Sequence, residues 1–444
     1  MNLEYLKNKK VCLLGLGLEN LSLAKYLAKQ GIAVSVLDKR SSKELNDRYE
    51  SIKKIKAIFY GGSGYLDKIS NFDVIFKTPG FVGKLKRKNG AIITTPMALF
   101  FDLCPAKIIA VTGTKGKGTV ASLCHHVLIH SNKKAWLAGN IGKAPFDFID
   151  KLKPDHFVVL ELSSFQLIDF KNRPHIAVVT NLFPEHLSPA DPINPIFHKS
   201  LKEYYAAKAN IFLNQKKKNW LVINKNNHHS ENLLKKTKAR VVFFKTNSNL
   251  PRNPHLIGRH NQENIAAACE AVKILKISKK TINRAIENFR GLKHHLEFIA
   301  EINGVKFYND SASTMPQATL AAIRSFDKSV ILIIGGVNKG YNLKKFTKDL
   351  LKSSHPIAIM LIGRTAKELF GYFKNMQSKL KNHLSTAYYR GDKNIQEIVR
   401  ETAAIASREG DIVLFSPGFA SFDMFKNSKD RGEKFKEAVY SIRA

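Results

Sequence analysis

One segment constrains the fold of this chain more than any other: a run of small and basic residues between two regular patterns. Ile108–Val111 is a β-branched run typical of a buried strand, and a helical pattern begins at about Thr119. The intervening segment, Gly113–Thr119, reads GTKGKGT. Glycines let several backbone N–H groups point at one anion, and the free N–H groups of a helix N-terminus attract the same charge. This order of strand, glycine-rich loop and helix predicts a cradle for the phosphates of ATP.

The side chains of the loop fit the same prediction. Lys117 adds a full positive charge, and the Thr119 hydroxyl can bind Mg2+. The loop departs from the full Walker pattern, because Val111 replaces its first glycine and Gly118 stands where a serine or threonine normally follows the lysine. A turn before a helix that binds no ligand remains the structural alternative. The candidate ATP-binding residues of the loop are Gly113, Thr114, Lys115, Gly116, Lys117, Gly118 and Thr119.

Strand-like and helix-like runs alternate along the whole chain, which predicts α/β domains with mainly parallel sheets. A length of 444 residues is too great for one ordinary core, so more than one domain is expected. The pattern predicts three domains, and we place their boundaries at 1–103, 104–293 and 294–444. The predicted strands include KVCLLGLG from Lys10, IAVSVLD from Ile32, FDVIFKTPG from Phe72, AIITT from Ala91, HFVVLEL from His156, KSVILIIGG from Lys328, IAIMLIG from Ile357 and DIVLFSPG from Asp411.

The net charge of +36 predicts affinity for anions such as nucleotides, nucleic acid or acidic lipid. The lysines are spread along the chain, however, and the solvated surface of a lysine-rich protein is the simpler explanation. Because no basic stripe is interleaved with aromatic residues, a nucleic-acid partner is not expected. A basic P-loop protein that acts on nucleic acid remains the alternative from another functional class.

Cysteine usage and hydropathy point to a reducing compartment. The four cysteines, Cys12, Cys104, Cys124 and Cys269, show no CxxC spacing, so neither a disulfide framework nor a zinc site is expected. The early apolar run Val11–Leu18 is far shorter than the roughly 20 residues that cross a bilayer. The sequence therefore predicts a cytoplasmic protein without a membrane span.

The first strand is followed by a pattern similar to a dinucleotide-binding fingerprint. Gly15 and Gly17 follow the strand, but Asn20 stands at the third glycine position. Asp38 ends the second strand, where a ribose-binding acid is expected. From this motif alone, an NAD site and a set of ordinary strand-end turns are both open alternatives.

Several motifs occur in one order along nearly the whole chain, and this order resembles the Mur ligases. The loop TGTKGKGT is similar to the T-G-T-N-G-K-[ST]-T motif of that family. The other motifs are GLGL at Gly15, TPG at Thr78, GNIG at Gly139, ELSSFQL at Glu161, YYAAK ending at Lys208, GRHNQEN at Gly258, YNDS at Tyr308 and SPGFASFDMFKNSKDRG at Ser416. Each motif is weak by itself, whereas the ordered combination is specific.

The resemblance implies a three-domain α/β enzyme. A Rossmann-like N-terminal domain would bind a UDP-sugar, a central P-loop domain would bind ATP, and a Rossmann-like C-terminal domain would bind an amino acid. The motifs resemble most the ligases that add D-glutamate to UDP-N-acetylmuramoyl-L-alanine through an acyl phosphate. That reaction belongs to cytoplasmic peptidoglycan precursor synthesis, and thus to cell wall biogenesis, cell shape and cell division. The implied ligands are this UDP-sugar, glutamate, ATP and Mg2+, and a monomer is expected.

The resemblance also implies the residues of the site. Without it, Lys208 would be a surface lysine of a helix, and the asparagines would be caps or turn residues. The implied catalytic residues are Lys117, Asn140, Glu161, His186 and Lys208. The implied Mg2+ ligands are Thr119, Glu161, His186 and Lys208, and Lys208 would be carbamylated by CO2. ATP would also contact Asn261, Asn264, His295 and Asp310. The UDP-sugar would contact Leu18, Glu19, Asn20, Asp38, Lys39, Arg40, Thr78, Pro79, Gly80, Asn140 and Ser163. Glutamate would contact Thr314, Lys339, Ser421 and Phe422.

Four positions depart from the family pattern. Gly118 removes a hydroxyl expected at Mg2+, and His295 replaces an arginine at the phosphates. Ala312 replaces the lysine of the common NDSKAT motif, and Ser428 replaces an aromatic residue next to the glutamate carboxylate. The segments NDSASTMPQAT and FPEHL are somewhat similar to those of related ligases that add L-glutamate. A ligase for L-glutamate or another amino acid, and a non-catalytic nucleotide-binding relative, therefore remain alternatives.

Overall fold

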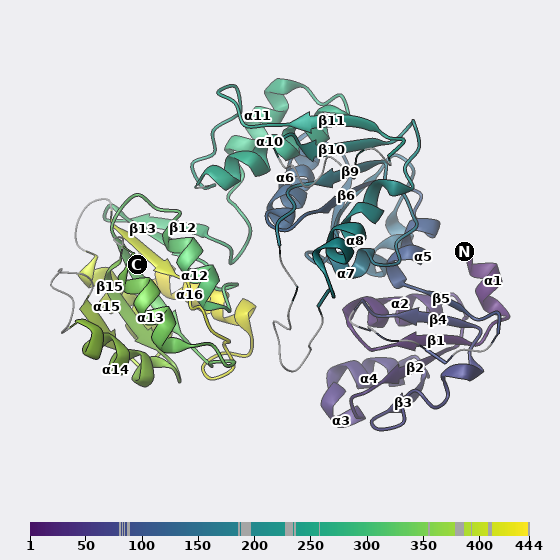
Figure 1. Ribbon diagram of the computed structural model, residues 1–444, viewed down its shortest axis with the longest axis horizontal. Coiled ribbons are helices and arrows are strands. Elements are labelled where there is room, and N and C mark those ends of the chain that lie inside the picture. Colours follow the sequence, from purple (N-terminus) through teal and green to yellow (C-terminus); the bar gives the residue numbers. More distant parts are fainter. Residues whose placement is uncertain are drawn as a thin grey trace. The chain divides into compact units, whose positions relative to one another are not determined.

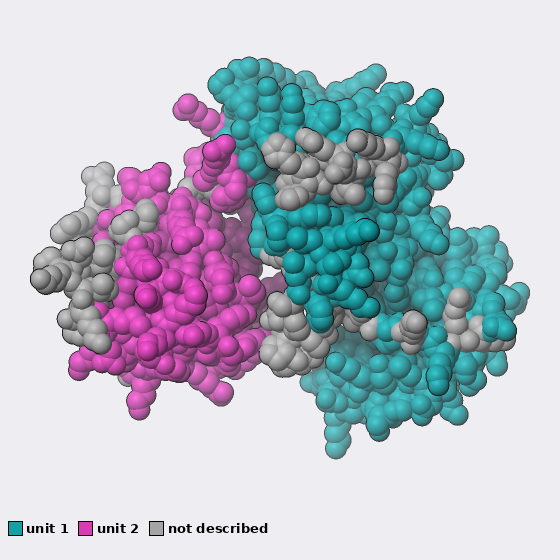
Figure 2. Space-filling model, in the orientation of Figure 1, with its two compact units in different colours: residues 1–251, 262–287 teal, residues 252–261, 288–444 magenta. Residues whose placement is uncertain are grey.

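The structure is a computed structural model, and it describes residues 1–79, 81, 83, 85–86, 89–184, 187, 197–226, 234, 237–256, 258–353, 356–377, 386–391, 393–406 and 411–442. The chain divides into two compact units (Figure 2). Unit 1 comprises residues 1–251 and 262–287, and unit 2 comprises residues 252–261 and 288–444. The described residues form three sheets, two in unit 1 and one in unit 2 (Figure 1). No helix in these residues has the length and apolarity needed to span a membrane.

The first sheet has the strand order β3-β2-β1-β4-β5 and is parallel throughout. Its strands are β1 (Val11–Leu14), β2 (Val34–Asp38), β3 (Ile58–Gly61), β4 (Val74–Lys77) and β5 (Ile92–Thr94), and its helices are α1 (Leu3–Lys7), α2 (Leu18–Lys29), α3 (Ser42–Leu45), α4 (Asp47–Lys54) and α5 (Pro96–Leu103). Chain order reverses between β1 and β4, so the loops at their carboxyl ends border the position at which open α/β sheets bind ligands.

The second sheet has the order β11-β10-β9-β6-β8-β7 and is also parallel. Its strands are β6 (Lys107–Thr112), β7 (Ala135–Gly139), β8 (Phe157–Glu161), β9 (Ile176–Val179), β10 (Trp220–Asn224) and β11 (Arg240–Phe244). The helices that accompany it are α6 (Lys117–His130), α7 (Ser164–Leu167), α8 (Leu201–Leu213), α10 (Arg259–Lys273) and α11 (Lys279–Glu287). Because β6, β8 and β9 are parallel neighbours, the segments that follow them meet at one edge.

The third sheet, in unit 2, has the order β12-β13-β17-β14-β15-β16, and only β12 runs antiparallel to its neighbour. Its strands are β12 (Glu297–Ile302), β13 (Val305–Asn309), β14 (Val330–Gly335), β15 (Pro356–Ile362), β16 (Thr386–Tyr389) and β17 (Ile412–Phe415). The helices are α12 (Pro316–Ile323), α13 (Leu343–Leu351), α14 (Ala366–Gln377), α15 (Ile395–Ile405) and α16 (Ser428–Ile442).

The alternating direction of side chains along β14 explains how the third sheet is covered on both faces. Leu332 and Ile334 lie in a core that includes side chains of α13 and α14. Ile331 and Ile333 lie in a second core, with side chains of α15 and α16. Successive strand residues point to opposite faces, so a continuously apolar strand requires a layer of helices on each side.

The predicted α/β class with mainly parallel sheets is confirmed. Helix α6 begins at Lys117, slightly before the predicted start at about Thr119, because Gly116 adopts a left-handed conformation with a φ of 79° and ends the loop there. The predicted strands did not include β3, β12, β13 or β16. Asn303 and Gly304, with φ values of 51° and 77°, join β12 to β13, and this Asn-Gly pair is a sequence signal for a tight hairpin.

Candidate active site

The glycine-rich loop lies between the carboxyl end of β6 and the first turn of α6. Gly113 has a φ of 146°, and a Cβ atom there would lie 1.9 Å from Thr180 Oγ1. Gly116 has a φ of 79°, and a Cβ atom there would lie 2.1 Å from Asn264 Oδ1. Both positions therefore require glycine, for conformation and for space. The loop ends at the N-terminus of α6, whose partial positive charge favours the binding of phosphate.

Neighbouring segments hold the loop in this shape. The backbone N–H of Thr114 donates to Asn181 O over 2.8 Å, and the N–H of Lys115 donates to Asn181 Oδ1 over 2.8 Å. Thr180 Oγ1 donates to Lys115 O over 2.6 Å, and Thr114 Oγ1 lies 3.0 Å from the hydroxyl of Tyr204 in α8. The Thr114 hydroxyl and the Lys115 N–H, both among the predicted ATP contacts, thus stabilise the loop itself.

A buried carboxylate lies next to the loop, at the carboxyl end of β8. Glu161 is 4% exposed, and its Oε2 atom has no hydrogen-bond partner among the described residues. Burial raises the pKa of Glu161, whereas the charge of Lys117, a hydrogen bond from the Asn140 side chain and the charge of Lys208 oppose that rise. The fold therefore brings together four of the five predicted catalytic residues, from β8, α6, α8 and the turn after β7. The fifth, His186, lies outside the described residues.

Two lysines donate hydrogen bonds to carbonyl groups of the loop. Lys117 Nζ donates to Thr114 O over 2.9 Å, and Lys208 Nζ donates to Gly113 O over 2.6 Å. Lys208 is only 2% exposed, and its ammonium group lies 4.7 Å from the centre of the Tyr204 ring. The surface position that helical periodicity alone predicts for Lys208 is therefore wrong, because this face of α8 packs against the loop.

The oxygen donors beside the loop suit Mg2+. The unpaired Oε2 atom of Glu161 is a hard, anionic ligand, and Thr119 lies in the first turn of α6. The described residues contain no cluster of three or more His, Cys, Asp or Glu side chains that could hold a metal alone. Mg2+ usually takes one or two protein carboxylates and completes its shell with water and substrate phosphates, so one carboxylate beside a phosphate loop fits this ion.

Two asparagines of α10 were predicted at ATP. Asn264 is buried against the phosphate loop, where its Oδ1 atom restricts the space at Gly116. Asn261 lies one turn earlier in α10, is also buried, and belongs to unit 2. The structure thus places Asn264 at the loop by its contacts with Gly116.

Polar groups converge at the carboxyl ends of β1, β2 and β4. Asp38 Oδ2 accepts a hydrogen bond of 2.6 Å from the backbone N–H of Leu16 and one of 2.7 Å from Arg40 Nη2. Burial opposes ionisation of Asp38, but the hydrogen bonds from Arg40 and Leu16 hold the pKa of its carboxyl group below the usual range. A Cβ atom at Gly15 would lie 2.6 Å from Thr78 Cγ2. Asp38, Arg40 and Thr78 therefore surround the turn between β1 and α2.

The other residues predicted at the UDP-sugar occupy different kinds of position. Asn20 is buried, and its amide nitrogen donates to three backbone carbonyls of β1, β4 and the turn between β1 and α2, so it stabilises that turn. Glu19 Oε1 accepts a hydrogen bond of 2.5 Å from Gln166 Nε2, and burial raises the pKa of Glu19. Ser163 caps the N-terminus of α7. Leu18 and Lys39 are exposed, Pro79 follows Thr78, and Gly80 lies outside the described residues.

In unit 2, the segments after β14 and β17 meet at the carboxyl edge of the third sheet. Val337 and Ala420 exchange backbone hydrogen bonds of 2.8 and 3.2 Å. This bridge places the ammonium group of Lys339 5.8 Å from the centre of the exposed Phe422 ring. Ser421 is buried beside Phe422, and Thr314 follows β13 at the same edge. The four residues predicted at glutamate therefore lie on three neighbouring strand ends.

Asp310 is buried at this edge. Its Oδ2 atom accepts hydrogen bonds of 2.5 Å from Ser313 Oγ and 2.7 Å from Ser416 Oγ, and its Oδ1 atom accepts one of 3.1 Å from the N–H of Leu296. Burial raises the pKa of Asp310 to about 6, although these hydrogen bonds oppose the rise. His295, the residue before Leu296, is exposed.

We expect Asp310 to make the stability of the protein depend on pH. Its pKa in the folded chain is about 6, above the ordinary 3.8, so between these values the folded state holds a proton that the unfolded state has released. The free energy of unfolding should therefore fall as the pH rises through this interval, by about 1.4 kcal/mol per pH unit. When the Asp310→Asn variant is melted in a calorimeter at several pH values, its free energy of unfolding should not show this decrease. An identical slope in both proteins would contradict the assignment.

Arg431 was not singled out from the sequence, although it connects two of these segments. It is 1% exposed, in the first turn of α16. Nη1 donates to Phe419 O over 2.9 Å, and Nη2 donates to Ser311 O over 2.8 Å. Burial lowers the pKa of Arg431 to about 10. The guanidinium group thus fixes the segment after Asp310 against the loop that carries Ser421. An arginine in a polar motif gives no sequence signal that it is buried.

Replacement of Arg431 by leucine should lower the free energy of unfolding by about 3 kcal/mol, because two buried carbonyl groups lose their donors. Arg431→Lys should retain part of that stability, since a lysine can donate to one of the carbonyls. Lys429→Leu, at an exposed position in the same turn, is the control and should change little. Calorimetry on the three variants would test this; equal melting temperatures for Arg431→Leu and the control would be inconsistent with the assigned contacts.

Comparisons with known proteins agree with this arrangement. Residues 9–88 match the family model "Mur ligase MurD-like, N-terminal domain", and residues 111–253 match "Mur ligase middle domain". A protein of Ruminiclostridium cellulolyticum named UDP-N-acetylmuramoylalanine–D-glutamate ligase is 36% identical, with 98% of this chain and 97% of that protein covered. Its namesake from Clostridium tetani is 35% identical, with 99% and 98% covered.

Solved structures show the same fold at lower identity. A crystal structure of MurF from Acinetobacter baumannii has a TM-score of 0.60 at 13% identity and covers 92% of this chain and 91% of its own. UDP-N-acetylmuramate-alanine ligase MurC from Thermotoga maritima has a TM-score of 0.53 at 17% identity and covers 98% of this chain and all of its own. These likenesses concern the fold alone.

Proposed function

Because this chain belongs to the Mur ligase family, we propose that it joins D-glutamate to UDP-N-acetylmuramoyl-L-alanine in an ATP-dependent reaction that forms an amide bond. The relatives named for this reaction align with 98% and 99% of the chain. The observation that carries the proposal is the meeting of Lys117 with the buried Glu161 carboxylate at the phosphate loop. The reaction class is that of an ADP-forming acid–amino-acid ligase.

The chemistry requires two successive steps at one carboxyl group, the first at phosphorus and the second at the carbonyl carbon. An oxygen of the UDP-sugar substrate's carboxylate attacks the γ-phosphorus of ATP, and ADP leaves. The glutamate amine then attacks the carbonyl carbon of the acyl phosphate, the C–O bond to phosphate breaks, and the amine loses a proton. Phosphoryl transfer needs positioning and charge neutralisation more than covalent catalysis by the protein. A loop with two lysines, Lys115 and Lys117, and a helix N-terminus supplies both.

We assign Lys117 to the transferred phosphoryl group. Its ammonium now donates to Thr114 O within the loop, so a phosphate would compete for a proton donor that is already held in place. Asn140 would orient the substrate carboxylate, because its side chain lies at the strand end beside Glu161. The protein contributes fixed charges here, which cost no reorganisation during the reaction.

Mg2+ is the metal that the family uses, and it neutralises phosphate charge when it is bound. We propose Thr119, Glu161, His186 and Lys208 as the residues that hold it. For Lys208 this requires carbamylation, in which the neutral amine adds to CO2 and releases a proton. Carbamylation would replace the hydrogen bond to Gly113 O with an anionic oxygen ligand, and the burial of Lys208 would protect that product from water.

We assign the remaining ligand-binding roles to residues that lie near the carboxyl ends of strands. The turn between β1 and α2, with Asp38, Arg40 and Thr78, would hold the UDP group, and Asn264 and Asp310 would contact ATP. Lys339, with Thr314, Ser421 and Phe422, would hold glutamate, since a dicarboxylate needs a cation and hydrogen-bond donors. We propose the domain boundaries 1–103, 104–293 and 294–444 for these three roles. A monomeric enzyme in the cytoplasm, where peptidoglycan precursors are made, completes the proposal.

A phosphate-release assay on the purified full chain tests this function. With ATP and Mg2+, phosphate should appear only when both UDP-N-acetylmuramoyl-L-alanine and D-glutamate are present. L-glutamate should be slower by about 100-fold, because a site built for one enantiomer leaves polar groups of the other unpaired. Faster reaction with L-glutamate would instead identify the L-glutamate ligase. ATP turnover that rises with DNA or RNA and falls steeply with salt would favour a nucleic-acid enzyme.

A further inference from the structure

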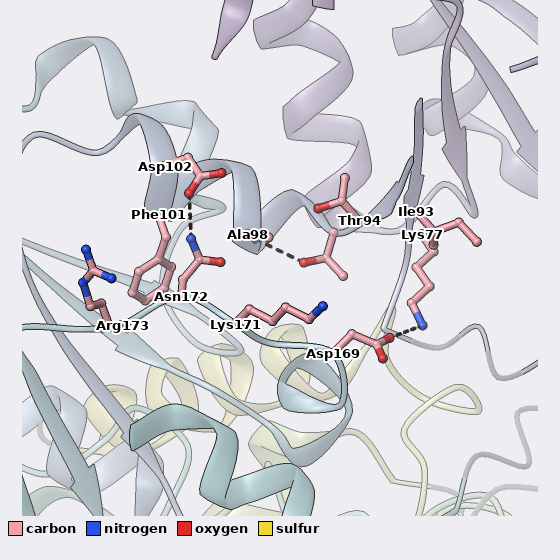
Figure 3. A pocket seen from close by; sticks show the side chains of 11 residues that line it. Lys77, Ile93, Thr94, Ala98, Phe101, Asp102, Asp169, Lys171, Asn172 and Arg173 are labelled. Atoms are coloured by element: carbon pink, nitrogen blue, oxygen red, sulfur yellow. Dashed lines mark hydrogen bonds and ion pairs between the residues drawn. The ribbon is translucent and has the colours of Figure 1, made fainter. Parts of the chain in front are cut away.

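A cavity of about 900 Å³ lies in unit 1, between the edge of the first sheet and the segment that joins α7 to β9 (Figure 3). This volume is within the range of about 300–1,000 Å³ in which proteins bind small organic ligands. We call it the seam cavity and define it by Lys77, Thr94, Phe101, Asp169, Lys171 and Arg173. The first three come from β4, β5 and α5, and the last three come from the segment before β9.

The seam cavity is separate from the phosphate loop. Strands β6 and β9 are parallel neighbours, and the loop follows the carboxyl end of β6, whereas Arg173 precedes the amino end of β9. The two features therefore lie toward opposite edges of the second sheet. In the first sheet, β4 separates Thr94 of β5 from β1 and its turn. None of the residues that we assign to ATP, UDP-sugar or glutamate lines the cavity.

Both carboxylates of the cavity already have cationic partners. Asp169 Oδ2 lies 2.5 Å from Lys77 Nζ. Asp102 Oδ2 lies 2.7 Å from the N-terminal ammonium of Met1, and its Oδ1 accepts a hydrogen bond of 2.8 Å from Asn172 Nδ2. Figure 3 shows the contacts of Asp169 with Lys77 and of Asp102 with Asn172, which cross from one wall to the other. The negative charge of the lining is therefore compensated by Lys77 in the lining and by the N-terminal ammonium of Met1.

Two cations remain. Lys171 and Arg173 are exposed, and neither makes a hydrogen bond or ion pair with any described residue. They are two residues apart on one segment, and Figure 3 shows the Lys171 ammonium between the walls and the Arg173 guanidinium pointing the opposite way, on the far side of Phe101. The opposite wall is partly apolar: Phe101 lines it, and its ring centre lies 4.9 Å from that of Phe170, with the rings edge to face. The cavity thus combines uncompensated positive charge with an aromatic surface.

We propose that the seam cavity is a second ligand site, which binds a small organic anion. A carboxylate or phosphate group would lie at the Lys171 ammonium, where charge-assisted hydrogen bonds are available, and an apolar or aromatic body would pack on Phe101, with Arg173 adding positive charge on the other side of that ring. Because the walls belong to the first and second sheets, the bound anion adds contacts between these two parts of unit 1. This inference does not depend on the ligase reaction.

Methyl NMR of the full chain, labelled at the isoleucine δ1 methyl groups, tests the proposal. Ile93 lines the cavity, and Ile323, buried in unit 2, serves as the reference signal. Phenyl phosphate and benzoate are the probes, with benzyl alcohol as the uncharged counterpart. The Ile93 signal should shift saturably with either anion and little with the alcohol. The Lys171→Ala/Arg173→Ala variant should bind the anions about tenfold more weakly or worse.

Two further variants separate this site from other sources of anion binding. Lys153→Ala removes an exposed lysine of unit 1 that does not line the cavity, and it should leave the Ile93 titration unchanged. Lys117→Ala disables the phosphate loop and should also leave it unchanged. Three results would each overturn the proposal. They are loss of the Ile93 shift in Lys117→Ala, binding of benzyl alcohol as strong as that of the anions, and full anion affinity in the Lys171→Ala/Arg173→Ala variant. A preference between phenyl phosphate and benzoate would identify the chemical class of the natural anion.

Discussion

Lys117→Ala is expected to lower kcat/KM for ATP by about 1,000-fold, which corresponds to roughly 4 kcal/mol of transition-state stabilisation. The physical reason is that Lys117 carries the full positive charge inside the loop, and its Nζ atom is already positioned by a hydrogen bond of 2.9 Å to Thr114 O. Removal of the side chain takes this charge away and leaves the developing phosphoryl charge less stabilised. Phosphate release in the presence of both substrates measures the effect.

Lys134→Ala is the matched control, because Lys134 is an exposed lysine just before the amino end of β7, whereas the loop follows the carboxyl end of the parallel strand β6. It should retain the activity of the unaltered protein. Melting curves of Lys117→Ala should show that the variant is folded, since the loop keeps the hydrogen bonds that the Thr114 and Lys115 N–H groups donate to Asn181. If folded Lys117→Ala forms product at full rate, the assigned phosphate site is wrong.

Glu161→Gln is expected to lower the rate of product formation by about 100-fold and to raise the Mg2+ concentration needed for half-maximal rate. Glutamine keeps the size of the side chain but removes the negative charge, and the Oε2 atom of Glu161 is a buried oxygen without a hydrogen-bond partner among the described residues. Weaker metal binding should therefore appear as a shift in Mg2+ dependence as well as a lower maximum rate.

The same substitution should not reduce thermal stability, because burial already disfavours the charged form of Glu161 and a neutral amide costs less to bury. Glu437→Gln, at an exposed position of α16, provides the control for a change of charge alone. A Mg2+ dependence identical to that of the unaltered protein would argue against Glu161 as a metal ligand. A large loss of stability would show that the carboxylate has a structural role instead.

Local sequence patterns predicted much of the fold. The β-branched and leucine-rich runs before Gly15, Gly113 and Gly335 became buried parallel strands, because a strand covered on both faces needs continuous apolar residues. The hairpin at Asn303 was missed, although its Asn-Gly turn is a local signal. Two glycines of the loop, Gly113 and Gly116, are also explained locally, since their conformation and crowding exclude other residues.

Contacts between distant segments could not be predicted in the same way. Lys208 and Gly113 are 95 residues apart, and Arg431 and Ser311 are 120 residues apart. Helical periodicity described Lys208 as a surface lysine, and Arg431 was not singled out from the sequence. Only the packing of α8 and α16 against these loops decided that both cations are buried.

The order of motifs in the sequence thus indicated the family, and local patterns indicated most strands of the three sheets and the glycine-rich loop. Tertiary structure decided the rest: which carboxylate oxygen has no partner among the described residues, which lysine is buried, and which cations line the seam cavity. The reason is physical. Backbone conformation follows from neighbours along the chain, whereas burial and charge pairing depend on groups that folding brings together from far apart.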